Sequence, residues 1–343
     1  SAYELRRRAA GPQGRSFRQH RMMRKPAHQT FLGAPFRAAA DLAAAGAADT
    51  PRFAYLGLPL YVRYGHESGA PDTGLSTADA VRVASAAQGG IEHHYDFDLD
   101  GPLIPAGVSA EFFDCGDVAL AGTPEALAAD LAAGTAAVRD LVTAGAVPLV
   151  VAGDHSAPPV VVRGLPDDRP LDILHIDAHL DFRDEVAGLR DGYSSPIRRL
   201  RELPHVRTIV QVGLRDVGSA REDEVRAARA AGNILIRAEE VHEGGVVLLH
   251  DLAARFDPAH RVYITLDVDG LDPSTAPGTL WPAPGGLWYW QAAALIRAVA
   301  SRGDLAGMDV CEFAPGHDPH GHTALAVTRL LMLAAGASLR RAG

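Results

Sequence analysis

Three residues with metal-binding side chains, Asp177, His179 and Asp181, alternate with apolar residues near the middle of the chain. On an extended segment, side chains two positions apart leave from the same face, so these two carboxylates and one imidazole converge. Such a group is costly to bury unless a cation compensates it, and it is a typical ligand set for a divalent metal ion. The largely apolar residues 171–176 directly before it predict a buried strand. The three side chains then lie at the C-terminal end of a strand, where open parallel α/β sheets bind their ligands.

Two other segments that are predicted to leave strands carry side chains of the same kind. His155 follows the apolar segment 147–152, and Asp267 and Asp269 follow the segment 262–266. If these strands lie beside the first, they predict one metal centre with these ligands: His155, Asp177, His179, Asp181, Asp267 and Asp269. So many ligands suit two ions, with Mn²⁺ as the first choice and Ni²⁺, Co²⁺ or Zn²⁺ as alternatives. Ions about 3.5–4 Å apart hold a bridging water, whose pKa falls to about 7 and which then attacks as hydroxide at neutral pH.

Strand-like and helix-like segments alternate over most of the chain. Apolar and β-branched residues predict strands at 53–59, 112–118, 147–152, 171–177, 208–214, 234–238, 262–267 and 305–313. Helical periodicity covers residues 77–87, 124–145, 220–231, 289–302 and 323–336. This alternation predicts an α/β fold with a mostly parallel sheet covered on both faces. We expect one α/β domain over residues 51–343, preceded by a basic N-terminal arm with a short helix over residues 1–50.

Composition limits the class of function. The chain of 343 residues has a net charge of −9, which argues against nucleic acid as its partner. Two cysteines, Cys115 and Cys311, are too few for a disulfide framework and suit a reducing cytoplasm. No apolar segment approaches the roughly 20 residues that a membrane-spanning helix needs. We therefore expect a cytoplasmic protein that acts on a small molecule and binds neither membrane nor nucleic acid.

Taken together, the motifs resemble those of the ureohydrolases, the arginase and agmatinase superfamily, in its agmatinase-like branch. They are Gly-Asp-His-Ser at 153–156, Asp-Ala-His-Leu-Asp at 177–181 and Leu-Asp-Val-Asp-Gly-Leu-Asp-Pro-Ser at 266–274. A fourth match, Gly-Met-Asp-Val-Cys-Glu-Phe-Ala-Pro, covers residues 307–315. The resemblance spans about residues 53–338 and implies a three-layer α/β/α fold around a parallel sheet.

The resemblance also implies a ligand arrangement and a reaction. By the family pattern, one ion is held by His155, Asp177, Asp181 and Asp267, and the other by His179, Asp177, Asp267 and Asp269. Asp177 and Asp267 bridge the two ions in this pattern, and Asp181 accepts a hydrogen bond from the bridging hydroxide. Glu312 resembles the family carboxylate that holds the substrate guanidinium by charge-assisted hydrogen bonds. The implied protein is a dinuclear-metal hydrolase, in homotrimers or hexamers, that cleaves a guanidino compound to urea and an amine.

Two segments depart from the family pattern. Aligned on Pro196, the chain has Tyr193 where hydrolytic members usually carry a proton-shuttling histidine, and Ser194 follows as a candidate substrate contact. Tyrosine can pass a proton through its hydroxyl, although its ordinary pKa of about 10 suits neutral pH less well. Trp281 replaces a small residue beside the expected site, where its indole face would attract a cationic substrate and narrow the pocket.

The resemblance leaves several functions open. Agmatine or another ω-guanidino compound is the default substrate, with the acidic residues Asp184 and Glu185 as candidate partners of a distal amine. Guanidine itself or an N-alkylated biguanide is the alternative that Trp281 favours. A different class is a non-catalytic subunit that stabilises an active homologue in a hetero-oligomer, although such a partner should have lost ligands. A deacetylase-like amide hydrolase with one zinc ion is disfavoured by the paired Asp267 and Asp269.

Overall fold

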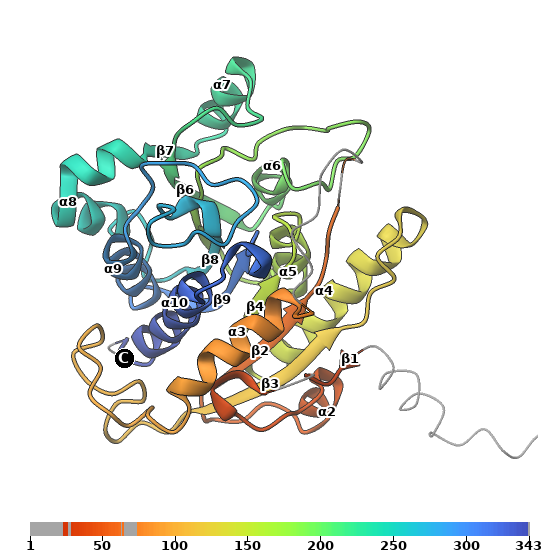
Figure 1. Cartoon of the computed structure of the whole chain (residues 1–343), viewed down its shortest axis with the longest axis vertical. Coiled ribbons are helices and arrows are strands. Elements are labelled where there is room, and N and C mark those ends of the chain that lie inside the picture. Colours follow the sequence, from red (N-terminus) through yellow and green to blue (C-terminus); the bar gives the residue numbers. More distant parts are fainter. Residues whose placement is uncertain (1–22, 27–28, 63, 65–73, 342–343) are drawn as a thin grey trace, which may run out of the picture.

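The computed structural model describes residues 23–26, 29–62, 64 and 74–341. These residues form a nine-stranded sheet in the order β1-β3-β2-β4-β9-β8-β5-β6-β7, which crosses the centre of the molecule (Figure 1). All neighbouring strands are parallel except β1 and β3. The strands are β1 (Met23–Arg24), β2 (Arg52–Leu58), β3 (Glu111–Val118), β4 (Ala146–Ala152), β5 (Leu171–Ile176), β6 (Val206–Leu214), β7 (Ile234–Arg237), β8 (Arg261–Asp267) and β9 (Asp304–Cys311).

Helices cover both faces of the sheet (Figure 1). On one face, α3 (Thr77–Ser85), α8 (Ala238–Ala253), α9 (Tyr289–Ala300) and α10 (His322–Ser338) pack together. The other face carries α2 (Ala39–Ala44), α4 (Leu127–Thr143), α5 (Pro158–Gly164), α6 (Pro196–Arg201) and α7 (Glu222–Ala230). The predicted three-layer α/β/α architecture with a mostly parallel sheet is thereby confirmed.

Alternate residues of each central strand supply two separate cores. In β4, Leu149 and Val151 belong to the core under α3, α9 and α10, whereas Val150 and Ala152 belong to the core under α4 and α5. A strand that is buried on both faces needs apolar residues at nearly every position, which explains the near-continuous apolar segments of the sequence. Such strands end abruptly where polar residues begin, and the candidate functional residues lie at these ends.

The expected strands are all present, with ends within two residues of the predicted ones. The sequence pattern missed α8, because the pair Gly244-Gly245 interrupts its helical signal. Gly245 has a φ of 52°, so the helix is kinked at this position. Two short helices that begin with proline, α5 and α6, were also not predicted.

The beginning of the chain is described only in part. Residues 1–22 of the expected arm lie outside the described residues. Further along, β1 pairs with β3, and Phe31 is buried with its ring stacked on Tyr55 at a centroid distance of 4.5 Å. The expected short helix corresponds to α2, and the domain boundary at residue 50 stays a prediction.

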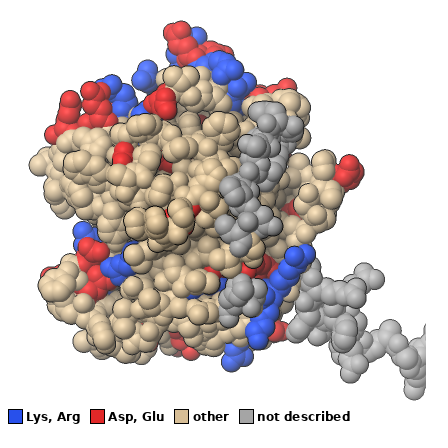
Figure 2. All heavy atoms as spheres, viewed as in Figure 1, with Lys and Arg blue, Asp and Glu red and all other residues tan. Residues whose placement is uncertain are grey.

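The surface is unevenly charged. Charged side chains gather at the end of the molecule formed by α7, whereas the middle of the face in view is largely uncharged (Figure 2). Within the part of the chain that the structure describes, no helix is both long and apolar enough to cross a bilayer.

Candidate metal centre

The sequence motifs leave four strands that are neighbours in the sheet. β4, β9, β8 and β5 are consecutive in the strand order and pair in parallel, so their C-terminal ends meet at one edge. His155 follows β4, Glu312 follows β9, Asp267 and Asp269 lie at the end of β8, and residues 177–181 follow β5. The fold therefore brings together all six predicted metal ligands and the predicted guanidinium-binding carboxylate.

Asp177 lies between two sets of potential ligand atoms. On one side, His155 Nδ1 is 3.1 Å from Asp177 Oδ2 and 2.8 Å from Asp181 Oδ2. On the other side, His179 Nδ1 is 3.5 Å from Asp177 Oδ1 and 3.1 Å from Asp269 Oδ2. The two oxygens of one buried carboxylate thus face two different sets, each compact enough to hold an ion. This arrangement suits a carboxylate that bridges two cations.

Asp267 lies on the His155 side of the cluster. Its Oδ2 is 3.5 Å from His155 Nδ1, while its Oδ1 accepts a hydrogen bond from the backbone N–H of Asp269 at 2.9 Å. Among the described residues, the two compact sets share Asp177 and do not include Asp267. A bridging role for Asp267, which the family pattern implies, stays a prediction.

A row of buried polar side chains crosses the sheet two residues before the ligands. The backbone register aligns Gln211 of β6 with His175 of β5, His175 with Thr265 of β8, and Thr265 with Asp309 of β9. All four residues are fully buried. Residues paired across neighbouring strands share a face of the sheet, so these side chains reach one another. Buried polar groups need hydrogen-bond partners, and hydrogen bonds among these side chains and His155 provide them.

Hydrogen bonds along this row determine the tautomer of His175. Arg201 can only donate, and its Nε and Nη2 lie 2.9 and 2.8 Å from Asn233 Oδ1, so Asn233 Nδ2 donates to Gln211 Oε1 at 2.8 Å. Gln211 Nε2 in turn donates to His175 Nδ1 at 3.1 Å. His175 therefore carries its proton on Nε2, which donates to Asp177 Oδ2 at 2.8 Å. Although His175 is close enough to the ligands to join the first set, it orients Asp177 and has no lone pair left for an ion.

The other end of the row determines the tautomer of His155. Thr265 donates its hydroxyl hydrogen to Asp309 Oδ1 at 2.8 Å, so its oxygen accepts from His155 Nε2 at 3.1 Å. The lone pair of His155 Nδ1 then points at Asp177 and Asp181. Imidazole ligands of metal ions are commonly held in this way, through the nitrogen that does not bind the ion. The donor set of the cluster therefore fits two divalent cations.

Crowding and burial shift the pKa values of the cluster. Burial and the charge of Asp177 raise the pKa of both Asp181 and Asp269. Burial opposes protonation of His179, but hydrogen bonds to Asp177 and Asp269 outweigh it and raise its pKa to about 12. Burial, helped by the charge of Asp154, raises the pKa of Glu312 to about 8. The carboxylates thus need positive charge nearby, which either protons or divalent cations supply.

A cavity of about 350 Å³ opens onto the cluster. It is lined by all of the residues predicted to act on the substrate: Asp181, Tyr193, Ser194, Trp281 and Glu312. Trp281, which is 57% exposed, forms part of the cavity wall. Tyr193 packs against Tyr64 at a ring-centroid distance of 4.5 Å, and the Tyr64 hydroxyl accepts from the backbone N–H of Ser194 at 3.0 Å. Asp177 does not line the cavity because it is buried beneath the other ligands.

The backbone holds Glu312 against the metal ligands. Glu312 Oε1 accepts from the backbone N–H of His155 at 2.9 Å, and its own N–H donates to the Gly153 carbonyl at 2.8 Å. Glu312 and Asp181 both have positive φ angles, of 61° and 50°, which are unfavourable for residues other than glycine. Such strained conformations persist where the surrounding structure enforces them, and they concentrate at functional sites.

The interpretation of the sequence missed the residues that orient the ligands. His175 is two positions before Asp177 on a predicted strand, and this spacing alone could have placed it on the same face. Gln211 is a lone polar residue between Val210 and Val212, which is the usual signal of a buried, hydrogen-bonded side chain. The partners of these residues depend on the strand register, which no local pattern reveals.

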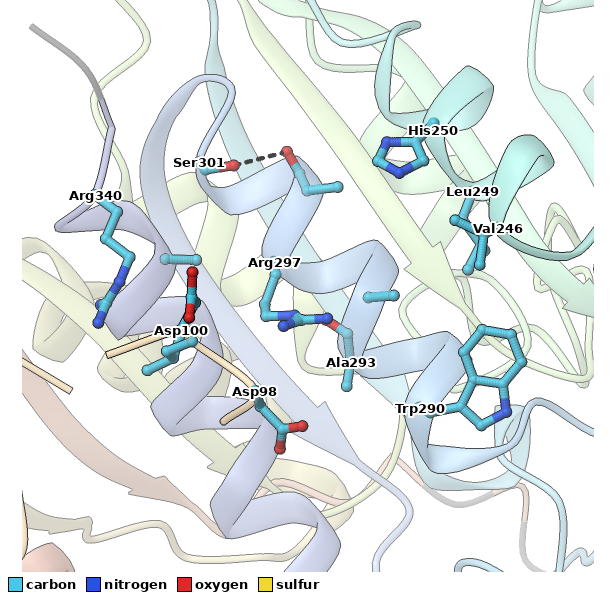
Figure 3. A pocket seen from close by; sticks show the side chains of 14 residues that line it. Asp98, Asp100, Val246, Leu249, His250, Trp290, Ala293, Arg297, Ser301 and Arg340 are labelled. Atoms are coloured by element: carbon cyan, nitrogen blue, oxygen red, sulfur yellow. Dashed lines mark hydrogen bonds between the residues drawn. The ribbon is translucent and has the colours of Figure 1, made fainter. Parts of the chain in front are cut away.

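A larger cavity lies away from the metal centre. It has a volume of about 540 Å³ and is formed by α8, α9 and α10 together with residues 98–100 (Figure 3). Trp290 and Arg297 of α9 line it, but none of the predicted metal ligands does. The candidate chemistry therefore belongs to the smaller cavity.

Comparison with known proteins agrees with this geometry. The family model described as the arginase family matches residues 54–336. The guanidinopropionase of Pseudomonas aeruginosa is 39% identical over 191 residues, which cover 54% of this chain and 59% of that protein. The proclavaminate amidinohydrolase of Streptomyces clavuligerus is 31% identical over 300 residues, which cover 82% of this chain and 92% of that protein.

Solved structures show the same fold. The structure of the proclavaminate amidinohydrolase from Streptomyces clavuligerus aligns with a TM-score of 0.73 at 25% identity, over 94% of this chain and 99% of that one. An arginase from Medicago truncatula aligns with a TM-score of 0.67 at 24% identity, over 88% of this chain and 91% of that one. With these matches and the motifs converging at one edge of the sheet, the chain belongs to the arginase family.

Proposed function

We propose that this chain is a hydrolase that uses two divalent metal ions to cleave a guanidino compound into urea and an amine. The observation that carries the proposal is the position of Asp177, whose two oxygens face separate sets of ligand atoms beneath one cavity. Membership in the arginase family supports hydrolysis of a guanidino C–N bond. Relatives named guanidinopropionase and agmatinase support a guanidino substrate.

The ligand set would divide between the two ions. One ion would be held by His155, Asp177 and Asp181 with Asp267 close by, and the other by Asp177, His179 and Asp269. Mixed imidazole and carboxylate ligands favour Mn²⁺, with Ni²⁺ as the second choice. Two such ions, when bound, would supply a water molecule activated for attack at neutral pH.

The remaining groups would bind the substrate and move protons. A guanidinium is planar and positively charged, so the Glu312 carboxylate, which lines the cavity, would hold it by charge-assisted hydrogen bonds. Because Glu312 is hydrogen-bonded to the backbone N–H of His155, the bound guanidinium would lie at a fixed distance from the candidate metal ligands. Asp181 would accept the proton of the attacking water, and the Tyr193 hydroxyl would pass a proton to the leaving amine.

Guanidine or an N-alkylated biguanide is a second candidate substrate for the same chemistry. The supporting observation is Trp281, which occupies part of the cavity wall and leaves less room for a long substrate. A role as a non-catalytic subunit is less well supported, because every residue of the expected ligand set is present and the described ligand atoms converge.

Asp269→Ala tests the metal pair directly. We expect the variant to bind fewer divalent ions per chain. It should also release urea at least about 10-fold more slowly, since even changes to the partners of metal ligands cost roughly 10- to 100-fold. Asp223→Ala, at an exposed aspartate of α7, is the matched control and should retain both properties. Metal content is measured on purified protein loaded with Mn²⁺ or Ni²⁺, and urea release on agmatine, 4-guanidinobutyrate, guanidine and a dimethylbiguanide. Wild-type metal content and activity in Asp269→Ala would contradict the proposal.

A further inference from the structure

The active-site cavity carries positive charge that the proposed hydrolysis does not use. Its inner wall is acidic, with Asp181, Asp269 and Glu312, but Arg183 and Arg221 also line it. Asp181 and Asp269 are buried and Glu312 is half-buried, as is Arg183, whereas Arg221 is exposed. The cavity is thus negative at its inner end and positive toward solvent.

The charge of Arg183 is already compensated within the protein. Its Nε lies 2.7 Å from Glu224 Oε1, and its Nη1 donates to the Ser219 carbonyl at 3.2 Å. Glu224 Oε2 also accepts from the backbone N–H of Arg221 at 2.7 Å. The Arg183–Glu224 ion pair and its hydrogen bonds therefore connect the segment 217–221 to the loop that carries the candidate metal ligands.

Arg221 lines the cavity, and among the described residues no carboxylate pairs with its guanidinium. Its Nη1 donates to the same Ser219 carbonyl. Across residues 23–26, 29–62, 64 and 74–341, no carboxylate lies within ion-pair distance of the Arg221 guanidinium. The neighbouring acid Glu222 is paired instead with Arg226, at 2.7 Å. An arginine that keeps free donors in a ligand cavity is suited to a carboxylate, which it can bind through two parallel hydrogen bonds.

Two acids of the neighbouring loop, Asp184 and Glu185, are not among the residues that line the cavity. Asp184 accepts from Arg199 at 2.7 Å and does not line the cavity, and Glu185 is exposed and does not line it either. Within the described residues, the acids of the cavity wall are therefore those of the metal end: Asp181, Asp267, Asp269 and Glu312. The described residues therefore give no support to Asp184 or Glu185 as partners of a distal amine, which stays a prediction.

The segment that carries Arg221 is held directly against a metal ligand. A Cβ atom added to Gly218 would lie 2.5 Å from His179 Cδ2, so only glycine allows this close approach. Because the segment packs on His179 and is hydrogen-bonded to Arg183 and Glu224, the backbone at Arg221 is held beside the candidate metal ligands.

We propose that the substrate is an ω-guanidino carboxylate, whose guanidinium binds at Glu312 and whose carboxylate binds Arg221. This inference rests on the proposed guanidino hydrolysis and adds the class of substrate. The cavity, at about 350 Å³, is near the lower end of the roughly 300–1,000 Å³ of small-molecule sites and suits such a short dipolar molecule.

The test compares three substrates of similar length that differ in the distal group: 4-guanidinobutyrate, agmatine and butylguanidine. Wild-type protein should hydrolyse 4-guanidinobutyrate with a kcat/KM roughly 10- to 100-fold above that of butylguanidine, the range expected for a hydrogen bond to a charged group. Arg221→Glu should abolish this advantage and leave butylguanidine within about threefold of wild type. Arg226→Glu, on the same helix and outside the cavity, is the matched control and should keep the wild-type preference.

Binding gives a second measurement that does not depend on turnover. Calorimetry with Asp181→Asn protein should show that adding Arg221→Glu weakens 4-guanidinobutyrate binding by a similar factor, while Arg226→Glu has no effect. Urea release without a preference for the carboxylate, or a preference that survives in Arg221→Glu, overturns the assignment and leaves the proposed function standing. No urea from any guanidino substrate in metal-loaded protein overturns the proposed function, and the inference falls with it.

Discussion

Replacing Gln211 with glutamate should weaken metal binding without changing the shape of the core. Gln211 is fully buried, and its amide nitrogen donates both to His175 Nδ1 at 3.1 Å and to the Leu180 carbonyl at 2.8 Å. A glutamate carboxylate has the same shape but only accepts hydrogen bonds. While the new carboxylate is ionised, His175 must carry protons on both nitrogens, one for this carboxylate and one for Asp177.

The expected magnitude follows from these contacts. The Leu180 carbonyl would lose its donor, which costs about 1–3 kcal/mol for a buried group. An imidazolium beside Asp177 would compete with the ions for the carboxylate that both ligand sets share. Changes in the groups that orient metal ligands typically cost about 10- to 100-fold in metal affinity, and we expect a loss in this range.

The assay is a competition titration of Mn²⁺ against a chelating indicator, together with urea release at saturating metal. Gln291→Glu is a matched control, because Gln291 is also buried and its Nε2 lies 3.3 Å from His242 Nδ1, far from the metal ligands. This control should retain the wild-type metal affinity. If Gln211→Glu binds Mn²⁺ as tightly as the wild type and hydrolyses substrate at the same rate, the tautomer assigned to His175 is refuted.

Three further predictions concern pH, stability and packing. Burial and the charge of Asp154 raise the pKa of Glu312 to about 8, and in the proposed mechanism its ionised form would bind the guanidinium, so kcat/KM should rise with pH. Asp154→Asn removes a negative charge and should move this rise to lower pH; an unmoved profile contradicts the assignment. Arg82 is fully buried among three carboxylate partners, so Arg82→Met should lower the free energy of unfolding by about 3–5 kcal/mol in a denaturant titration. A change below about 1 kcal/mol would show that these ion pairs do not stabilise the fold. Gly218→Ala should bring a methyl group into contact with His179, at an overpacking cost of about 1–3 kcal/mol, and should reduce the number of ions bound per chain. Full metal content in this variant would show that the segment moves away from His179 instead.

Local sequence patterns were sufficient to predict the strands and the side chains that converge at their ends. Each ligand motif directly follows an apolar strand, so the period-two alternation of a strand and its polar end could be read without knowing the fold. The segment around Gly244 and Gly245 shows where this approach failed, because a kinked helix lacks one continuous period. The ion pair between Asp184 and Arg199 could not be predicted for another reason. It joins a loop residue to a helix residue, and the spacing of charges in the sequence did not reveal this pairing.

The residues that orient the ligands could not be predicted, because they depend on strand register. Gln211, His175, Thr265 and Asp309 come from four strands that are separated in sequence, and only their pairing in the sheet aligns them. Each would be a costly buried polar group on its own strand, yet together they give His155 and His175 their tautomers.

The same register ties metal binding to the integrity of the sheet. A shift of β6 by one residue would turn Gln211 to the opposite face and replace it with an apolar neighbour. His175 would then lose the donor that fixes its protonation, and Asp177 would lose a fixed orientation between the two ligand sets. The candidate ligands at the strand ends are therefore positioned by the pairing of strands in the middle of the sheet. We expect substitutions in the buried polar row to weaken metal binding even where the protein still folds.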